Sequence, residues 1–262
     1  MERINRKGVS AVNKPPKLYF VIPCYNEEEA LPLTAPVFRR KLSDLGDRID
    51  PESRIVLVDD GSKDTTWEII RRLHEEDEHF SGLRLGRNRG HQNALTCGLM
   101  WAMDRCDITI SIDADLQDDI DAVDAMIEKY GEGCGIVCGV RASRATDTFL
   151  KRTTARGYYA LMKLFGSDLI YDHADYRLMD RPALEALSHF HGDDLFLRGL
   201  VNRLGATVGT VTYDRRAREA GESKYTLKKM LKLAMKGMEC GRRKPESAPR
   251  EPDPALCEVL HV

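Results

Sequence analysis

Two carboxylates placed directly after an apolar run are the side chains of this chain best suited to chemistry. Asp113 and Asp115 follow residues 108–112, whose β-branched composition is typical of a buried parallel strand. Both carboxyls are ionised at neutral pH and repel each other. A Mg²⁺ or Mn²⁺ ion that also holds a phosphate would relieve this repulsion, because both ions prefer oxygen ligands. The alternative is that the acidic stretch only caps the next helix.

Polar residues also follow three earlier strand-like segments, at Pro23-Cys24-Tyr25-Asn26-Glu27, Asp59-Asp60-Gly61-Ser62 and Arg87-Asn88-Arg89-Gly90-His91. The carboxyl ends of parallel strands meet at one edge of a sheet, where open α/β proteins bind ligands. Four polar strand ends in succession therefore predict a site for a polar, anionic ligand. The dinucleotide motif G-x-G-x-x-G and the P-loop motif are both absent from the sequence, which disfavours those two kinds of site.

The elements that must position these residues alternate along the chain. Strands are predicted at 18–22, 54–58, 83–85, 108–112 and 135–139, and helices at 28–45, 64–76, 91–104 and 120–130. This rhythm predicts a single Rossmann-like α/β domain with a mostly parallel, doubly wound central sheet. Beyond residue 141 the pattern changes to a helix at 148–165, helical segments after Pro182 and around 194–204, and a strand at 207–213.

Composition narrows the class of protein. A chain of 262 residues with 42% hydrophobic content can bury one substantial core, and a net charge of −2 gives no general attraction to nucleic acid. The seven cysteines are scattered, as expected for reduced residues of a cytosolic protein. The sequence shows no secretory signal and no run of the roughly 20 apolar residues that a membrane span needs. These features predict a cytoplasmic protein.

The ends of the chain differ in character from its centre. We expect a flexible lead at 1–16, one domain at 17–224, an amphipathic helix at 225–238 and a disordered tail at 239–262. In the amphipathic segment the apolar face and the lysine face separate, which suits either a membrane-interfacial helix or a helix packed on the sheet. Each lysine near an anionic surface would contribute on the order of 1 kcal/mol to docking.

Five segments in order, VIPCYNEEEALP, IVLVDDGSKDTTWEII, GRNRGHQNALTCGL, ISIDADLQDD and HADYRLMDRPALEAL, resemble family 2 glycosyltransferases. The resemblance is closer to the polyprenyl-phosphate sugar transferases, which include dolichol-phosphate mannose synthases and undecaprenyl-phosphate glucosyltransferase-like enzymes. It covers about residues 17–238 and implies a glycosyltransferase A-type, nucleotide-diphospho-sugar-binding domain. Many bacterial members continue into two transmembrane helices. This chain instead has a polar tail, which fits either loss of that anchor or a naturally peripheral enzyme, and a homo-oligomer is left open.

Carried over by position, the resemblance implies a set of site residues. Asp113, Asp115 and Gln117 would hold Mg²⁺ or Mn²⁺ and the diphosphate, with Asp113 closer to the sugar–phosphate bond as a catalytic residue. Asp175 falls where the family has its general base. The nucleotide sugar would contact Pro23, Tyr25, Glu27, Asp59, Asp60, Arg218, Ser223 and Lys224. Independently of the resemblance, four basic residues flank the site and could hold the acceptor phosphate, or could form only a solvated basic face: Arg141, Arg144, Lys151 and Arg152.

The implied reaction is inverting transfer of a sugar from a nucleoside-diphosphate sugar, such as UDP-glucose, to a polyprenyl phosphate. The chain would act as a peripheral protein at the cytoplasmic membrane face. A phosphate monoester is already largely ionised at pH 7, since its second pKa is about 6. Asp175 would then need only to position the acceptor or to take a residual proton. Two alternatives stay open: a hydroxyl acceptor with Asp175 as a true base, and a nucleotide-binding remnant without activity.

Overall fold

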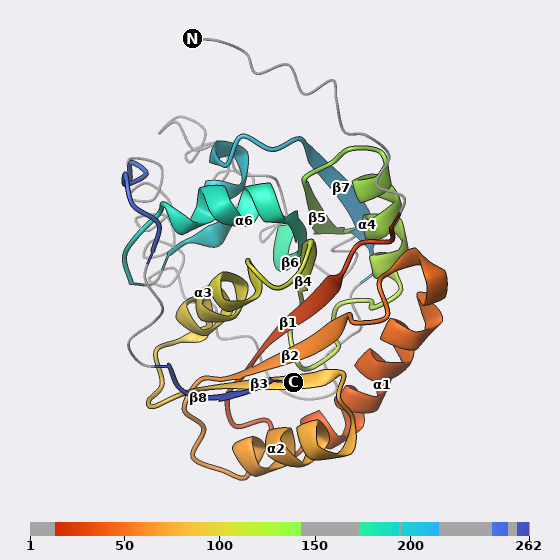
Figure 1. Cartoon of the computed structure of the whole chain (residues 1–262), viewed down its shortest axis with the longest axis vertical. Coiled ribbons are helices and arrows are strands. Elements are labelled where there is room, and N and C mark those ends of the chain that lie inside the picture. The colour runs from red at the N-terminus through yellow and green to blue at the C-terminus, as the bar shows by residue number, and fades with distance from the viewer. Residues whose placement is uncertain (1–13, 143–172, 194, 215–242, 251–255, 262) are drawn as a thin grey trace, which may run out of the picture.

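The computed structural model describes residues 14–142, 173–193, 195–214, 243–250 and 256–261. Within these residues the strands form one eight-stranded sheet in the order β7-β5-β6-β4-β1-β2-β3-β8 (Figure 1). The strands are β1 (Leu18–Cys24), β2 (Arg54–Asp59), β3 (Phe80–Leu85), β4 (Ile108–Ser111), β5 (Ile136–Arg141), β6 (His173–Asp180), β7 (Val208–Tyr213) and β8 (Leu256–Leu260). The predicted mostly parallel α/β sheet is confirmed.

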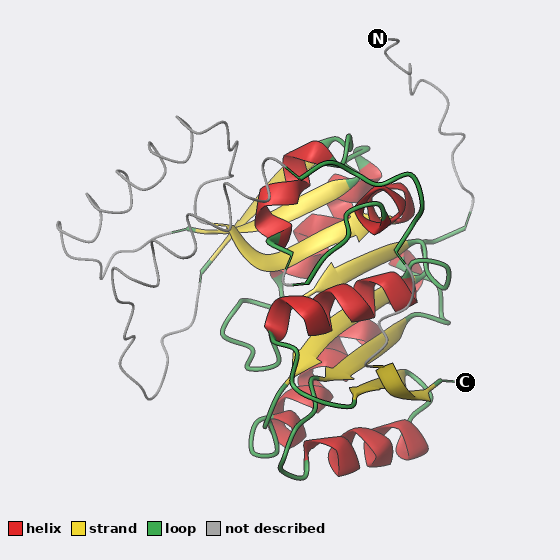
Figure 2. Cartoon of the chain, turned by 90° about the vertical axis from the view of Figure 1, so that its left-hand side faces the viewer, coloured by secondary structure: helices red, strands yellow, loops and turns green. Residues whose placement is uncertain are grey.

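Helices cover both faces of this sheet (Figure 2). They are α1 (Leu31–Asp44), α2 (Thr66–Glu76), α3 (His91–Ala102), α4 (Ala122–Gly131), α6 (Arg181–Ser188) and α7 (Leu197–Leu200), with 3₁₀ turns at Gly46–Arg48 and Val201–Arg203. The predicted start of α1 at residue 28 is three residues too early. Pro32, which lacks an N–H and suits the first turn of a helix, lies at the observed start.

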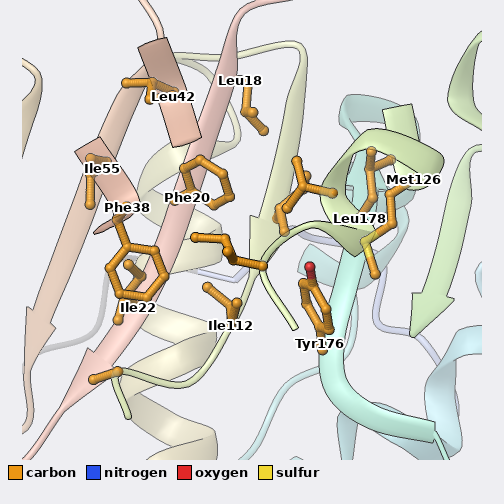
Figure 3. Packing of buried hydrophobic residues seen from close by; sticks show 14 of the residues in the cluster. Leu18, Phe20, Ile22, Phe38, Leu42, Ile55, Ile112, Met126, Tyr176 and Leu178 are labelled. Atoms are coloured by element: carbon orange, nitrogen blue, oxygen red, sulfur yellow. The ribbon is translucent and has the colours of Figure 1, made fainter. Parts of the chain in front are cut away.

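The core is divided between the two faces by the alternation of each strand. Leu18, Phe20 and Ile22 of β1 pack in one cluster with α1, α2 and α4 (Figure 3). Tyr19 and Val21 pack in a second cluster with α3, α6 and α7. Both faces of β1 are therefore buried, and the strand is fixed between two layers of helices. This burial holds its carboxyl end in place at the site.

β6 is an interior strand of the sheet, although no strand was predicted at these residues. It pairs antiparallel with β4 on one side and with β5 on the other. Tyr176 and Leu178 enter the first core cluster, whereas the intervening Asp175 and Arg177 are buried polar residues. These two charged side chains obscured the apolar pattern of an interior strand. Through Asp175, β6 contributes to the site.

The tail at 239–262 requires a correction, because the disorder predicted there is wrong for its last part. β8 pairs antiparallel with β3, in a register that sets Leu83 opposite Val259. Leu260 packs against the first core cluster, and the His261 ring meets Trp101 edge-on with centroids 4.9 Å apart. Five residues with apolar members are enough to add an edge strand, which the high Pro and charge content of the surrounding tail concealed.

The amphipathic segment at 225–238 and the helix predicted at 148–165 lie outside the described residues. None of the helices that the structure does describe combines the length and the apolar character needed to cross a bilayer.

Candidate active site

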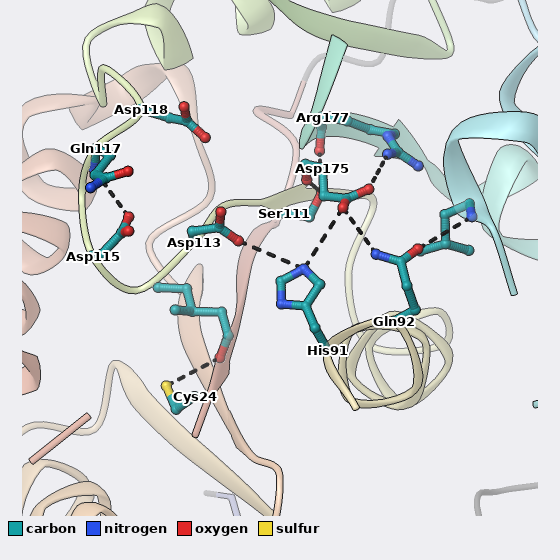
Figure 4. A network of polar contacts seen from close by, with 12 residues as sticks. Cys24, His91, Gln92, Ser111, Asp113, Asp115, Gln117, Asp118, Asp175 and Arg177 are labelled. Carbon is teal, nitrogen blue, oxygen red and sulfur yellow. Dashed lines mark hydrogen bonds and ion pairs between the residues drawn. The ribbon is translucent and has the colours of Figure 1, made fainter. Parts of the chain in front are cut away.

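The acidic loop after β4 lies at the carboxyl edge of the sheet (Figure 4). The carboxylate of Asp115 accepts a hydrogen bond from the Gln117 N–H at 3.1 Å, in a turn where Leu116 has a φ of 49°. Asp118 is buried and accepts a 2.8 Å bond from the Tyr213 hydroxyl of β7. The N-cap residue of α4 is Asp121, which makes no side-chain capping bond. The D-A-D carboxylates therefore do not serve as the cap of α4.

Asp113 is surrounded by negative charge. Burial raises the pKa of Asp113, the charges of Asp175, Asp118 and Asp115 raise it further, and His91 lowers it. The side chain is still 38% exposed, so a ligand can reach it. His91 Nε2 lies 3.7 Å from Asp113 Oδ1, too far for a hydrogen bond. Among the described residues, the loop thus gathers several carboxylate oxygens around Asp113, with His91 as a neighbour that lowers its pKa.

This donor set fits a hard divalent cation, because the oxygens of Asp113, Asp115 and Gln117 come from one short loop and the charge of Asp115 opposes the ionisation of Asp113. Burial followed by the charges of Asp115 and Asp113 also raises the pKa of Glu27, which follows β1. Among the described residues no group of three or more His, Cys, Asp or Glu side chains is arranged to hold a metal alone. The cation would therefore share its coordination with a ligand such as a diphosphate, as Mg²⁺ commonly does.

Asp175 on β6 occupies the opposite environment, although Figure 4 shows it close to Asp113 with His91 between them. Its Oδ2 accepts bonds of 2.9 Å from Arg198 Nη2 and from Gln92 Nε2, and its Oδ1 accepts one of 3.1 Å from Arg177 Nη2. Only 8% of the side chain is exposed. His91 Nε2 lies 3.8 Å from Oδ2.

These contacts determine the charge of Asp175. Burial by itself would raise the pKa of Asp175, but the charges of Arg198 and Arg177 and the hydrogen bond from Arg198 outweigh it. The net pKa lies well below the ordinary value of an aspartate. Asp175 is therefore ionised at neutral pH, and a carboxylate with so low a pKa is a weak base.

The loops after β1 and β2 are joined to each other by hydrogen bonds. The Asn26 N–H donates to Ser62 Oγ at 2.9 Å, and the Lys63 N–H donates to Asn26 Oδ1 at 2.9 Å. The Glu27 N–H donates to Thr66 Oγ1 at 2.8 Å, at the start of α2. Tyr25, which directly precedes these anchored residues, has an exposed side chain. The arrangement holds the Glu27 carboxylate near the charges of the acidic loop.

Asp59 and Asp60 lie deeper than the resemblance implied. Asp59 is 0% exposed, and its Oδ1 accepts the Ser62 N–H at 3.0 Å. Asp60 accepts the N–H groups of Arg89 and Gly90 at 2.7 and 2.8 Å. Both carboxylates organise the loops around them in this structure. Gly61, with a φ of 65°, is needed here, because a Cβ would lie 2.5 Å from the Arg87 carbonyl carbon.

The remaining predicted residues divide into described and undescribed ones. Pro23 is buried at the end of β1. Arg141 ends β5 and lies 3.5 Å from Asp118 Oδ1, so it supports the acidic loop from beneath. Arg144, Lys151, Arg152, Arg218, Ser223 and Lys224 lie outside the described residues.

Two contributors were missed from the sequence, Arg198 of α7 and Gln92 of α3. Arg198 stands in an apolar stretch 23 positions after Asp175, and no local spacing connects the two. Gln92 directly follows the polar end of β3, and that position was the available signal.

Comparison with known proteins identifies the family. The profile described as Glycosyl transferase family 2 matches residues 19–188. The chain belongs to this family. An uncharacterized glycosyltransferase of Bacillus subtilis (strain 168), YkoT, is 49% identical over 225 residues, which cover 85% of this chain and 67% of that protein. The bactoprenol glucosyl transferase of Shigella phage SfV is 36% identical over 223 residues, covering 85% of this chain and 71% of that protein.

Solved structures support the glycosyltransferase A-type fold of this family 2 enzyme. Glucosyl-3-phosphoglycerate synthase from Mycobacterium tuberculosis superposes with a TM-score of 0.59 at 17% identity, covering 94% of this chain and 90% of that one. Mannosyltransferase PcManGT from Pyrobaculum calidifontis, solved with GDP-Man and Mn²⁺, gives a TM-score of 0.55 at 17% identity over 80% of this chain and 59% of that one.

Proposed function

We propose that this glycosyltransferase transfers a sugar, with inversion, from a nucleoside-diphosphate sugar to a polyprenyl phosphate. The observation that carries the proposal is the environment of Asp175. The carboxylate in the position of the family's general base is held by two arginines and a glutamine and is a weak base. A hydroxyl acceptor requires a base, whereas a phosphate acceptor is already ionised at pH 7. The relatives named bactoprenol glucosyl transferases support the same acceptor.

The donor would lie along the loops after β1, β2 and β4. Asp113, Asp115 and Gln117 would hold Mg²⁺ or Mn²⁺ together with the diphosphate. When bound, the cation supplies charge stabilisation for the departing diphosphate. Tyr25 and Glu27, fixed by the bonds of their loop to Ser62 and Thr66, would border the nucleotide. Asp59 and Asp60 would contribute by holding these loops, and UDP-glucose is our first candidate donor.

The acceptor would approach from the side of Asp175. Arg177 and Arg198 place two positive charges around that carboxylate, close to the acidic loop. An anionic nucleophile is attracted to the arginines and kept apart from the acidic loop. Asp175 then acts by fixing Arg198 and Gln92, with no proton transferred to it.

A polyprenyl acceptor places the reaction at a membrane surface. The basic and apolar faces that the sequence predicts at 225–238 supply a candidate contact for that surface. The basic residues Arg144, Lys151 and Arg152 remain candidates for the acceptor phosphate, and Arg218, Ser223 and Lys224 for the donor.

The test is a donor screen. Purified protein with Mg²⁺ or Mn²⁺ is incubated with undecaprenyl phosphate in detergent and with each common radiolabelled nucleotide sugar. We expect label from one donor in the organic phase, as an acid-labile sugar phosphate of inverted anomeric configuration. Omission of the metal and the variant Asp113→Asn should both abolish it. Absence of lipid-linked label with every donor would count against the proposal.

A further inference from the structure

Strand β8 is connected to the proposed donor site through Arg84, which lies near both Glu258 of β8 and Asp59 at the end of β2. Its register places Glu258 opposite Arg84 of the neighbouring β3. The family match ends at residue 188, so β8 lies beyond the part of the chain that the family profile describes. What β8 contributes is therefore a property of this chain's own residues.

Glu258 holds two side chains on the sheet surface. Its Oε2 accepts a 3.1 Å hydrogen bond from Trp67 Nε1 of α2 and lies 4.0 Å from Arg84 Nη1. The Arg84 guanidinium carbon lies 5.5 Å from the centre of the Trp67 ring, within the range of a cation–π contact. Arg84 is therefore placed between the Glu258 carboxylate of β8 and the Trp67 indole, which donates a hydrogen bond to the same carboxylate.

Arg84 also lies near Asp59, whose side chain is 0% exposed. Arg84 Nε lies 3.6 Å from Asp59 Oδ2, an oxygen that is buried without a hydrogen-bond partner among the residues that the structure describes. Burying a carboxylate is costly unless a charge or a donor compensates it. Burial raises the pKa of Asp59, while bonds from Ser62 and the charge of Arg84 lower it. Arg84 supplies the positive charge next to the oxygen that lacks a donor.

Asp59 in turn positions the loop that carries Tyr25 and Glu27. Its Oδ1 accepts the Ser62 N–H, and Ser62 Oγ accepts the Asn26 N–H at 2.9 Å. A connected series of polar contacts thus runs from Glu258 through Arg84, Asp59 and Ser62 to Asn26.

We propose that β8 is a brace for the donor site, in which Glu258 and Arg84 act as positioning residues for the binding of a nucleoside diphosphate. This inference rests on the proposed function for the location of the donor. It predicts that loss of the Glu258 carboxylate weakens nucleotide binding without altering the affinity for the acceptor.

The experiment measures binding of UDP and of GDP, each with Mn²⁺, by calorimetry on the full-length protein and its variants. We expect Glu258→Gln to raise the Kd of the nucleotide that binds by about threefold to tenfold, and Arg84→Gln to raise it at least as much. The double variant should be no worse than Arg84→Gln alone, since both act through Asp59. Arg84→Lys, which keeps the charge, should recover part of the affinity.

The matched control is Val259→Thr, an exposed neighbour on the same strand, which should leave the Kd unchanged. Thermal melting of each variant separates a general loss of stability from the effect on binding. In a transfer assay Glu258→Gln should raise the KM for the donor and leave the KM for undecaprenyl phosphate unchanged.

Two outcomes overturn the brace. If the wild-type protein binds neither nucleotide, the donor site itself is misassigned, and the proposed function fails together with this inference. If the wild-type protein binds a nucleotide and Glu258→Gln and Arg84→Gln bind it equally well, only the brace is wrong.

Discussion

The acidic loop after β4 and the neighbouring strand β6 present the same residue type in opposite electrostatic surroundings. The charges of Asp115, Asp118 and Asp175 raise the pKa of Asp113. The neighbouring His91 lowers it. Asp175 is bonded to Arg177, Arg198 and Gln92. Burial acts to raise the pKa of both carboxyls, although Asp175 is the more buried, so the opposite net directions come from the neighbours.

The difference indicates which of the two carboxylates is suited to bind a cation. A buried charge is tolerated when the protein itself compensates it, as at Asp175, and such a group holds its partners in place. An acidic loop without compensation is destabilising by itself and becomes favourable when a cation binds. His91 lies 3.7 Å from one carboxylate and 3.8 Å from the other, at the boundary between these two regions.

The largest effect on sugar transfer is expected when one carboxylate of the acidic loop is neutralised. Asp113→Asn and Asp115→Asn should each reduce sugar transfer by about 100-fold or more, since charge stabilisation of the leaving group is lost. The free energy of unfolding should stay within about 1 kcal/mol of the wild type or rise, because repulsion is relieved. Transfer assays and urea unfolding of the metal-free protein measure the two effects. A large loss of stability would show that the carboxylates are structural.

At Asp175 we expect the opposite: a larger loss of stability and a smaller loss of sugar transfer. Asp175→Asn leaves two arginines near a neutral amide and should destabilise the fold by about 3 kcal/mol. Transfer should fall by about 10-fold to 100-fold through misplacement of Arg198 and Gln92. Arg198→Lys is the matched variant: it keeps the charge and loses the forked geometry, so its loss of transfer should be smaller. Equal stability of Asp175→Asn and wild type would contradict the described ion pairs.

The pH dependence of stability sharpens the same contrast. The pKa of Asp175 is lowered on folding, so its stabilising contribution is complete above the unfolded pKa of about 4 and is lost as pH falls through the folded value. The difference in unfolding free energy between wild type and Asp175→Asn should therefore be constant from pH 7 to 5 and shrink below about pH 4. Denaturant unfolding at each pH measures it. A difference that persists undiminished at pH 3 would be inconsistent with the lowered pKa.

The smallest expected effect concerns the support of the acidic loop. Tyr213→Phe removes the 2.8 Å hydrogen bond to buried Asp118, which retains Arg141 at 3.5 Å. We expect a loss of about 1 kcal/mol in stability and a decrease in transfer of only a few fold. Thr210→Ser, an exposed change on the same strand, is the control. Full activity with no loss of stability would show that the loop does not depend on this contact.

Regular periodicity made the parallel strands of the sheet predictable. The parallel strands β1, β2 and β4 are apolar runs with polar residues at their ends, so the sequence predicted both their positions along the chain and the acidic loop. Strand β6 was not predicted, because the charged residues Asp175 and Arg177 interrupt its apolar pattern. The ion pair between these two residues exists only within the folded sheet. Arg198 reaches Asp175 from a different element, and β8 reaches β3 from the far end of the chain. Contacts of this kind depend on topology and have no local signal.

The most direct test of the central claim compares two acceptors that differ only in the phosphate. Wild-type protein with Mn²⁺ and its preferred nucleotide sugar is given undecaprenyl phosphate or undecaprenol at equal concentration in the same detergent. The account predicts labelled lipid product with undecaprenyl phosphate and none with undecaprenol, because Asp175 cannot deprotonate a hydroxyl. Transfer to undecaprenol at a comparable rate, abolished by Asp175→Asn, would contradict it and restore Asp175 as a general base.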